Sequence, residues 1–452
     1  MSKFEEYRSQ YKTFEYKAYH YSIDGDRLKV VFDFETPGLA EFHPTWEFMI
    51  GRNDLDDENV KAALDALIFN LGMTETISYY KCACPEKMIV RCGYLSDEKA
   101  LWWRKLFYNG LGEFMYRNGI EVSEEDLLEI TSEGELKPQI KDDTVYEGFL
   151  IPVGGGKDSV VSLEVLKNEK VSTYHINNNS STLEVIDVFN DKKTDLCALR
   201  TLDKNMLELN SKGYLNGHTP FSAIVAFSSV ITAFLNRRKY IALSNETSAN
   251  ESTVKDSFVN HQYSKSYEFE EDFNNYIKTI VSSDIHYFSF LRPLTELQIA
   301  ALFSRYKAYH SVFRSCNVGS KKGIWCGNCP KCLFVYIILA PFLSESEEVS
   351  IFGEKLLDKE SLDKDFRELV GIDENKPFEC VGTRGEVAAS LSHFIKSGKK
   401  SLLTERYRKQ LEESRETVGD YMKKWESKHF VPAKYEEELR KALEECVTQL
   451  NI

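Results

Sequence analysis

A glycine-rich turn, Val153-Gly154-Gly155-Gly156-Lys157-Asp158-Ser159, most constrains the fold of this chain. The apolar run 146–153 before it is typical of a strand, and residues 159–167 after it have the pattern of a helix. Glycines let the backbone approach a bulky anion, and the first turn of the following helix directs free N–H groups and its positive dipole end at that anion. The turn therefore predicts a phosphate-binding loop where a strand ends and a helix begins.

The residues after the glycines suit the same ligand. Lys157 adds a positive charge, Ser159 can donate a hydroxyl hydrogen bond to phosphate, and Asp158 can orient the loop or hold Mg²⁺. The spacing differs from both the Walker A loop and the dinucleotide fingerprint. The alternative interpretation is a glycine turn that serves the fold alone.

Strands and helices alternate over residues 146–345. This order favours a parallel sheet covered by helices on both faces, with ligands beyond the carboxyl ends of the strands. Thr219-Pro220 is expected to begin a long apolar helix, with Thr219 as its N-cap and Pro220 at the first helical position. The further strands are expected at 172–176, 195–199 and 240–244, and a further helix at 182–189.

The flanking segments have different compositions. Residues 14–46 alternate aromatic and polar residues between turn signals, which predicts strands joined by hairpins, and residues 58–71 and 98–116 have helical patterns. Residues 346–452 are charged and helix-like. We therefore expect an α/β protein with three parts: an α+β N-terminal domain (1–145), a sheet domain (146–345) and a helical C-terminal region (346–452).

Composition limits the partners and the location. The 452 residues have a formal net charge of -14, and no basic footprint for nucleic acid is visible. The N-terminus is charged from its first residues, and the apolar stretches 221–235 and 332–343 are short for a bilayer span. We expect a cytoplasmic protein that acts on small molecules and contacts no membrane. Its oligomeric state is left open.

Four of the ten cysteines cluster along the chain, at Cys316, Cys326, Cys329 and Cys332. Four thiolates form the closed tetrahedral set of a structural Zn²⁺ site, and a C-x2-C-x2-C run also fits part of an iron–sulfur ligand set. Four unconnected thiols are the remaining alternative. We expect zinc with a structural role, because four cysteines leave no open coordination position.

Polar residues at the expected strand ends are candidates for substrate binding. They are His218, which precedes the Thr219-Pro220 cap, the group Asn245, Glu246, Ser248, Asn250 and Glu251 after the strand 240–244, and Arg292 after a later strand. A loop beyond the carboxyl end of a parallel strand is a suitable place to bind substrate or Mg²⁺. A solvated polar loop is the alternative, and a histidine at a helix start often makes only a local hydrogen bond.

These motifs together resemble known families. The glycine-rich turn resembles the S-G-G-x-D-S signature of PP-loop ATP pyrophosphatases, with Gly154 in place of the first Ser, and the cysteine cluster resembles that of the 7-cyano-7-deazaguanine synthases. Most of the chain is more similar to the UDP-N-acetylmuramoyl-L-alanyl-L-glutamate epimerase family of bacterial cell-wall synthesis. The segments behind this resemblance are 42–46 (FHPTW), 154–159 (GGGKDS), 216–220 (NGHTP), 244–251 (SNETSANE), the cysteine cluster and 378–383 (FECVGT).

The resemblance implies a reaction. ATP would convert the terminal L-Glu of UDP-MurNAc-L-Ala-L-Glu to D-Glu through a carboxyl adenylate, leaving AMP and diphosphate, with Mg²⁺ as a cofactor. Adenylation neutralises the carboxylate and makes the α-proton more acidic, so that a base and an acid can invert the centre. Residues 154–159 would bind the ATP phosphates. The residues expected to be catalytic are Lys157, Asp158, Glu246 and Cys380, with His218, Glu251 and Glu379 as further acid–base candidates.

Two other functions stay open at this stage. One is a PP-loop ligase or amidotransferase that adenylates another small carboxylate or a nucleobase. The other is a non-catalytic nucleotide-binding module, since Gly154 lacks the hydroxyl of the usual Ser.

Overall fold

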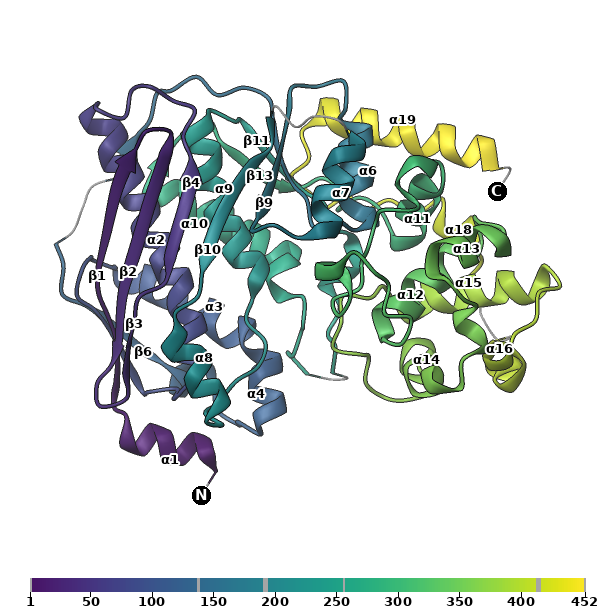
Figure 1. Cartoon of the computed structure of the whole chain (residues 1–452), viewed down its shortest axis with the longest axis horizontal. Helices are drawn as coiled ribbons and strands as arrows, with labels where there is room; N and C mark the ends of the chain where they lie inside the picture. The colour runs from purple at the N-terminus through teal and green to yellow at the C-terminus, as the bar shows by residue number, and fades with distance from the viewer. Residues whose placement is uncertain (1, 136–138, 190–193, 255–256, 412–415, 451–452) are drawn as a thin grey trace. The chain divides into compact units, whose positions relative to one another are not determined.

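The computed structural model describes residues 2–135, 139–189, 194–254, 257–411 and 416–450 (Figure 1). The chain forms two compact units. Unit 1 comprises Met1–Leu150, Leu196–Ile241 and Phe258–Tyr287, and unit 2 comprises Ile151–Asp195, Ala242–Ser257 and Phe288–Ile452. Each unit thus combines segments that are distant in the sequence. The three-part division of the sequence at 145 and 345 stays a prediction.

The N-terminal strands form the sheet of unit 1 in the order β10-β4-β2-β1-β5-β6, with β3 paired to β2. Neighbours among β1, β2, β3, β4 and β10 run antiparallel, whereas β5 runs parallel to β1 and β6 parallel to β5. Gly25, at φ +60°, turns the chain between β1 and β2. The strands span Thr13–Asp24 (β1), Arg27–Thr36 (β2), Ala40–Phe42 (β3), Thr45–Met49 (β4), Lys87–Val90 (β5), Glu129–Ser132 (β6) and Leu196–Thr201 (β10).

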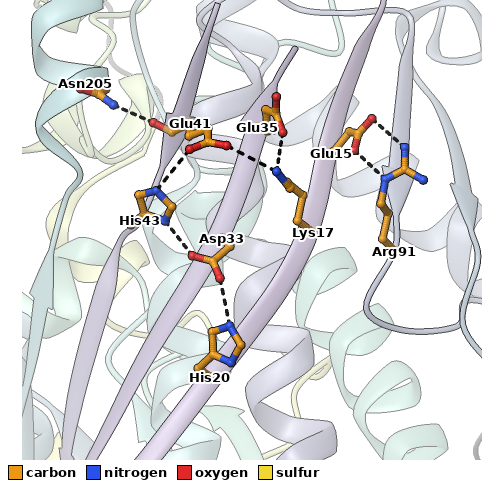
Figure 2. Close-up of polar contacts among 9 residues, drawn as sticks. All are labelled: Glu15, Lys17, His20, Asp33, Glu35, Glu41, His43, Arg91 and Asn205. Atoms are coloured by element: carbon orange, nitrogen blue, oxygen red, sulfur yellow. Dashed lines mark hydrogen bonds and ion pairs between the residues drawn. The ribbon is translucent and has the colours of Figure 1, made fainter.

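The two faces of this sheet differ. The inner face is aromatic and buried, as in β2, where Leu28, Val30, Phe32 and Phe34 alternate with more exposed residues. Figure 2 shows the polar outer face. There Asp33 lies 2.6 Å from His43 Nδ1 and 3.2 Å from His20 Nε2, and Lys17 lies 2.6 Å from Glu35. Because these groups are solvated, each pair contributes at most about 1 kcal/mol to stability.

Helix α2 (Glu58–Tyr80) is the central helix of unit 1. It packs against β1, β2 and helix α9 (Phe221–Asn236), and its second half is buried on all sides. Its Glu75 has no exposed side-chain surface; the carboxylate accepts from Trp46 Nε1 at 2.7 Å and from Arg200 Nε and Nη2 at 2.6 and 2.7 Å. A buried, bidentate ion pair thus ties α2 to β4 and β10. The other helices of unit 1 are α1 (Lys3–Gln10), α3 (Asp97–Gly110), α4 (Gly112–Asn118), α5 (Glu124–Leu127), α8 (Lys204–Ser211) and α10 (Tyr267–Ile280), and the short strands β7 (Ile140–Lys141) and β12 (Val281–Ser282) pair in parallel.

The glycine-rich turn follows a strand that belongs to a parallel part of the sheet. Strand β8 (Phe149–Pro152) pairs in parallel with β11 (Tyr240–Leu243), and the strand order there is β13-β11-β8-β9. Strand β9 spans Val171–Ile176 and β13 spans His286–Ser289, and helices α6 (Lys157–Val165) and α7 (Ser180–Phe189) follow β8 and β9. The strand–helix alternation predicted for this segment is therefore confirmed.

Two buried helices form the centre of unit 2. Every residue of α11 (Glu296–Ser304) is buried, and so are residues 331–339 of α12 (Pro330–Leu339). Helix α11 packs on α6, α12 and α19. The remaining helices are α13 (Glu345–Phe352), α14 (Asp363–Val370), α15 (Arg384–Lys396), α16 (Leu402–Arg406), α17 (Arg408–Leu411), α18 (Val418–Tyr421) and α19 (Ala433–Leu450). Among the described residues, no helix combines the length and apolarity needed to cross a bilayer.

The predicted fold class, α/β with an N-terminal α+β part and a helical C-terminal part, is confirmed. The predicted cap of α9 is wrong. Helix α9 begins at Phe221 with Pro220 as N-cap, and no side chain caps it. Instead, Thr219 Oγ1 accepts a hydrogen bond of 2.6 Å from Lys81 Nζ.

The Glu75 ion pair yields a stability prediction. Glu75→Ala leaves the Arg200 guanidinium, with a side chain only 10% exposed, and the Trp46 indole without their carboxylate. We expect the free energy of unfolding to fall by about 3–5 kcal/mol in urea titrations, because an unpaired buried charge remains. The control Glu58→Ala removes a carboxylate that is 90% exposed and should change it by about 0.5 kcal/mol or less. Equal effects of the two changes would contradict the prediction.

Candidate functional site

The glycine-rich turn presents bare backbone at the start of α6. Gly155 has φ +80°, and a Cβ there would lie 2.6 Å from Ser181 Oγ, so the turn requires glycine at this position. A Cβ on the exposed Gly154 would meet no atom within 4 Å. Helix α6 has Gly156 as N-cap and no side-chain cap, which leaves its first N–H groups available to an anion. Ser159 Oγ donates to Gly156 O at 3.0 Å and so stabilises the same turn.

Lys157 is buried beneath this turn and is paired with two carboxylates. Its side chain is 1% exposed, and its ammonium donates to Asp158 and to Glu296, the first residue of α11. Burial alone would lower the pKa of Lys157, but the two carboxylates outweigh it and raise the pKa above its usual value. Lys157 is therefore a charged link between α6 and α11.

Glu296 is the centre of a group of charges. Burial raises the pKa of Glu296 to about 8; the Lys157 ammonium opposes this rise, and the carboxylates of Asp158 and Glu246 add to it. The Lys331 ammonium also acts on Glu296. Three acidic and two basic side chains thus interact around Glu296, and we call these five residues the acidic cluster.

The loop after β11 contains most of the predicted substrate residues. Arg292 is fully buried; its Nη1 donates to Glu246 O at 2.6 Å, and Thr247 Oγ1 donates to Arg292 O at 2.6 Å. Asn245 Nδ2 donates to Ser289 Oγ at 3.0 Å. Arg292 and Asn245 therefore hold the loop in shape. Asn250 is exposed at the end of a short 3-10 helix.

A cavity of about 300 Å³ opens beside this loop. Ser248 and Glu251 line it, and Glu251 also pairs with Lys376 at 3.0 Å. The other lining residues are Thr247, Thr295, Thr383, Gly385, Glu386, Tyr421 and Lys424. The cavity thus unites the loop after β11 with Thr383, the last residue of the 378–383 segment, and with Gly385 and Glu386 just beyond it.

The four clustered cysteines converge as the sequence suggested. Their sulfur atoms all lie within 4.8 Å of one another, at 3.9 Å for Cys316–Cys329, 3.6 Å for Cys326–Cys332 and 3.4 Å for Cys329–Cys332. Tetrahedral zinc with bonds of about 2.3 Å separates its sulfur ligands by about 3.8 Å. The Gly319 N–H also lies 3.2 Å from Cys316 Sγ. The four thiols can therefore hold a metal ion.

The cysteine centre adjoins both the turn and the 378–383 segment. The Arg314 N–H donates to Gly155 O at 2.7 Å, two residues before Cys316. Lys331, between Cys329 and Cys332, donates to Cys380 O, and Asn317 donates to Glu379. The structure thus brings the cysteines, Cys380 and the acidic cluster into one region of unit 2.

A family model described as the MurL N-terminal domain matches residues 5–290, and one described as the MurL C-terminal domain matches residues 309–421. Proteins named UDP-N-acetyl-alpha-D-muramoyl-L-alanyl-L-glutamate epimerase are similar along most of the chain. Those of Micromonospora sp. and Salinispora tropica are each 34% identical and cover 82% of this chain, with 85% and 83% of their own lengths. That of Xanthomonas oryzae is 33% identical over 75% of this chain and 76% of its own length.

The chain belongs to this epimerase family. No solved structure was found to match it.

His218 is the one predicted site residue that lies in unit 1. Its Nδ1 is 3.4 Å from Glu113 Oε2, and its ring lies 4.5 Å from that of His261. Burial lowers the pKa of His218 to about 4, so its imidazole is neutral at physiological pH. These partners could not be predicted, since Glu113 and His261 are far from His218 along the chain.

Three further buried residues beside the turn and the cavity were not predicted from the sequence. Glu296 and Lys331 belong to the acidic cluster, and Glu386, buried in the wall of the cavity, accepts from Thr383 N–H at 2.9 Å. Glu296 lies four residues after Arg292, and Lys331 lies between Cys329 and Cys332. A charged residue beside a motif was the available signal, but its burial was not visible in the sequence.

The cysteine centre yields a metal-content prediction. Cys329→Ser should lower the zinc content of the purified protein by one ion per chain, because a hydroxyl is a poor replacement for a thiolate. Mass spectrometry of the metal after dialysis measures this loss. Cys197→Ser, which changes a thiol outside the cluster, is the control and should keep the full content. Equal metal contents of the two variants would exclude a metal centre at these cysteines.

Proposed function

We propose that this protein epimerises the terminal L-Glu of UDP-MurNAc-L-Ala-L-Glu to D-Glu, using ATP and releasing AMP and diphosphate, as a step of peptidoglycan precursor synthesis. Family membership supports the epimerase activity, and the names of the relatives support the substrate. The observation that carries the ATP-dependent part is the uncapped start of α6 behind Gly154, Gly155 and Gly156. It offers N–H groups and a helix dipole to an anion.

ATP serves in this proposal to acidify a carbon–hydrogen bond. A glutamate carboxylate oxygen attacks the α-phosphorus of ATP, and the bond to diphosphate breaks. The acyl adenylate has lost the negative charge that resists removal of the α-proton. A base then takes this proton, an acid returns one on the opposite face, and water cleaves the mixed anhydride to D-Glu and AMP.

Residues 154–159 are assigned to the ATP phosphates in this proposal. Mg²⁺ would find an oxygen ligand at Asp158, and it would neutralise phosphate charge at the turn. Lys157 already pairs with Asp158 and Glu296, so it can act on phosphate only through a rearrangement or as a fixed charge behind the turn. Ser248, Asn250 and Glu251 remain candidates for substrate binding. Ser248 and Glu251 line the cavity, which favours these two residues over Asn250.

Glu246 and Cys380 are the proposed proton-transfer residues. Glu246 is 4% exposed and belongs to the acidic cluster. Cys380 is half-buried, and its carbonyl accepts from Lys331. Both are therefore linked to the acidic cluster, Glu246 as a member of it and Cys380 through Lys331. Arg292 and Asn245, in contrast, are assigned to holding the loop after β11.

A product analysis in heavy water tests the whole proposal. With ATP, Mg²⁺ and UDP-MurNAc-L-Ala-L-Glu in D₂O, we expect AMP, a D-Glu product by chiral analysis, and deuterium at its α-carbon. A ligase or amidotransferase would form AMP only with an added amine and would keep the L configuration. A nucleotide-binding module would bind ATP without forming AMP. Either result would refute the epimerase proposal.

A charge-removing variant tests the role of the turn. Asp158→Asn keeps the side-chain size but removes a carboxylate that pairs with Lys157. We expect AMP formation to fall by about 100-fold or more, as for the loss of one electrostatic contact to a transition state. The control Asp56→Asn changes an exposed residue of unit 1 and should leave the rate unchanged. Unchanged AMP formation in Asp158→Asn would remove Asp158 from the reaction.

A further inference from the structure

Three side chains of unit 1 converge at a point that the proposed reaction does not use. Glu113 belongs to α4, His218 precedes α9, and His261 precedes the 3-10 helix Tyr263–Lys265. Their side chains are 7%, 21% and 12% exposed. One ligand atom from each lies within 4.8 Å of the other two. Two imidazoles and a carboxylate are thus gathered from three distant segments into a partly buried place.

One oxygen of Glu113 faces both histidines. Its Oε2 lies 3.4 Å from His218 Nδ1 and 2.5 Å from His261 Nδ1, and its Oε1 accepts from Arg117 Nε at 2.6 Å. Arg117 therefore fixes the carboxylate with Oε2 directed at the imidazoles, as outer-shell partners of metal ligands do.

The spacing suits a small divalent ion after a modest adjustment. Zinc bonds of about 2.0–2.1 Å in tetrahedral geometry separate the ligand atoms by about 3.3–3.4 Å. The His218–Glu113 distance has this value. The His261–Glu113 hydrogen bond would have to lengthen by about 1 Å, which a rotation of one side chain achieves.

We propose that Glu113, His218 and His261 bind a divalent transition-metal ion of the zinc class. Two nitrogens and one oxygen are the ligand set of metal sites that keep an open coordination position. This centre is separate from the four cysteines, which belong to unit 2. It gives His218 a ligand role in place of the substrate contact expected from the sequence.

The positive charge around this site indicates which ligand would occupy the open coordination position of the metal ion. Lys81 Nζ donates to Gly217 O and Thr219 Oγ1, on both sides of His218, and Lys265 acts electrostatically on the same imidazole. Arg117 pairs with Glu113, so three cationic side chains act on members of this group even before a metal ion is added. The site therefore takes an oxyanion, a carboxylate or a phosphate, as the additional ligand of the ion.

Metal content of the full chain tests this proposal without reference to activity. Protein dialysed against Zn²⁺ with inorganic phosphate, and then against metal-free buffer, should retain one zinc ion more than its His218→Ala and His261→Ala variants. The control His20→Ala removes an exposed histidine of β1 that pairs with Asp33, and it should retain the wild-type content. Circular dichroism of each variant identifies any that fail to fold.

A spectroscopic measurement on the wild type alone tests the proposal even if a histidine variant does not fold. In the Co²⁺-loaded wild type, phosphate should change the ligand-field bands but leave the thiolate-to-cobalt charge-transfer bands of the cysteine centre unchanged. Equal zinc contents of the wild type and both folded histidine variants would overturn the proposal. So would ligand-field bands that do not respond to phosphate. Either failure would leave the epimerase proposal untouched, since AMP formation is measured separately.

Discussion

The buried ammonium of Lys157 is the interaction on which unit 2 depends. It joins Asp158, in the first turn of α6, to Glu296, at the start of α11, and all three groups lie behind the glycine-rich turn. Burying a charge is costly unless it is paired, so these elements have to stay together. Helix α11 in turn packs on α6, α12 and α19, and α12 begins within the cysteine centre. The position of the turn is therefore coupled to the core of the whole unit.

The local parts of the site could be predicted because their chemistry lies in consecutive residues. Three glycines between an apolar strand and a helix predict an anion-binding turn, and the φ of Gly155 with its contact to Ser181 agrees with that requirement. The C-x2-C-x2-C run predicted a cluster, and the sulfur atoms do converge. The alternating aromatic residues of β1 and β2 predicted a sheet with one buried face. Each of these features needs only near neighbours.

Features that depend on tertiary partners could not be predicted. The substrate role of Arg292 stays a prediction, but the sequence did not indicate that its guanidinium is fully buried and contacts the backbone of the loop after β11. Thr219 was expected to cap α9, but Lys81, which is distant in the sequence, occupies its hydroxyl oxygen. Glu296 and Lys331 lie beside predicted residues, but their burial could not be inferred, because a charged residue at a helix start is usually solvated. In each case the sequence specified the residue type, and a distant segment decided its role.

The charge balance of the acidic cluster bears on how ATP would enter the site. Asp158 and Glu246 provide two carboxylates and Lys157 and Lys331 two ammonium groups, while burial raises the pKa of Glu296 to about 8, so that its carboxyl group is largely protonated at neutral pH. A polyphosphate that approaches the turn would add negative charge beside the two carboxylates, which is unfavourable in a partly buried place. A divalent cation between the carboxylates and the phosphate would remove this repulsion. In the proposed reaction, these carboxylates would therefore favour ATP that arrives together with Mg²⁺, and they would accommodate an adenylate, which carries less charge than ATP, more readily than ATP itself.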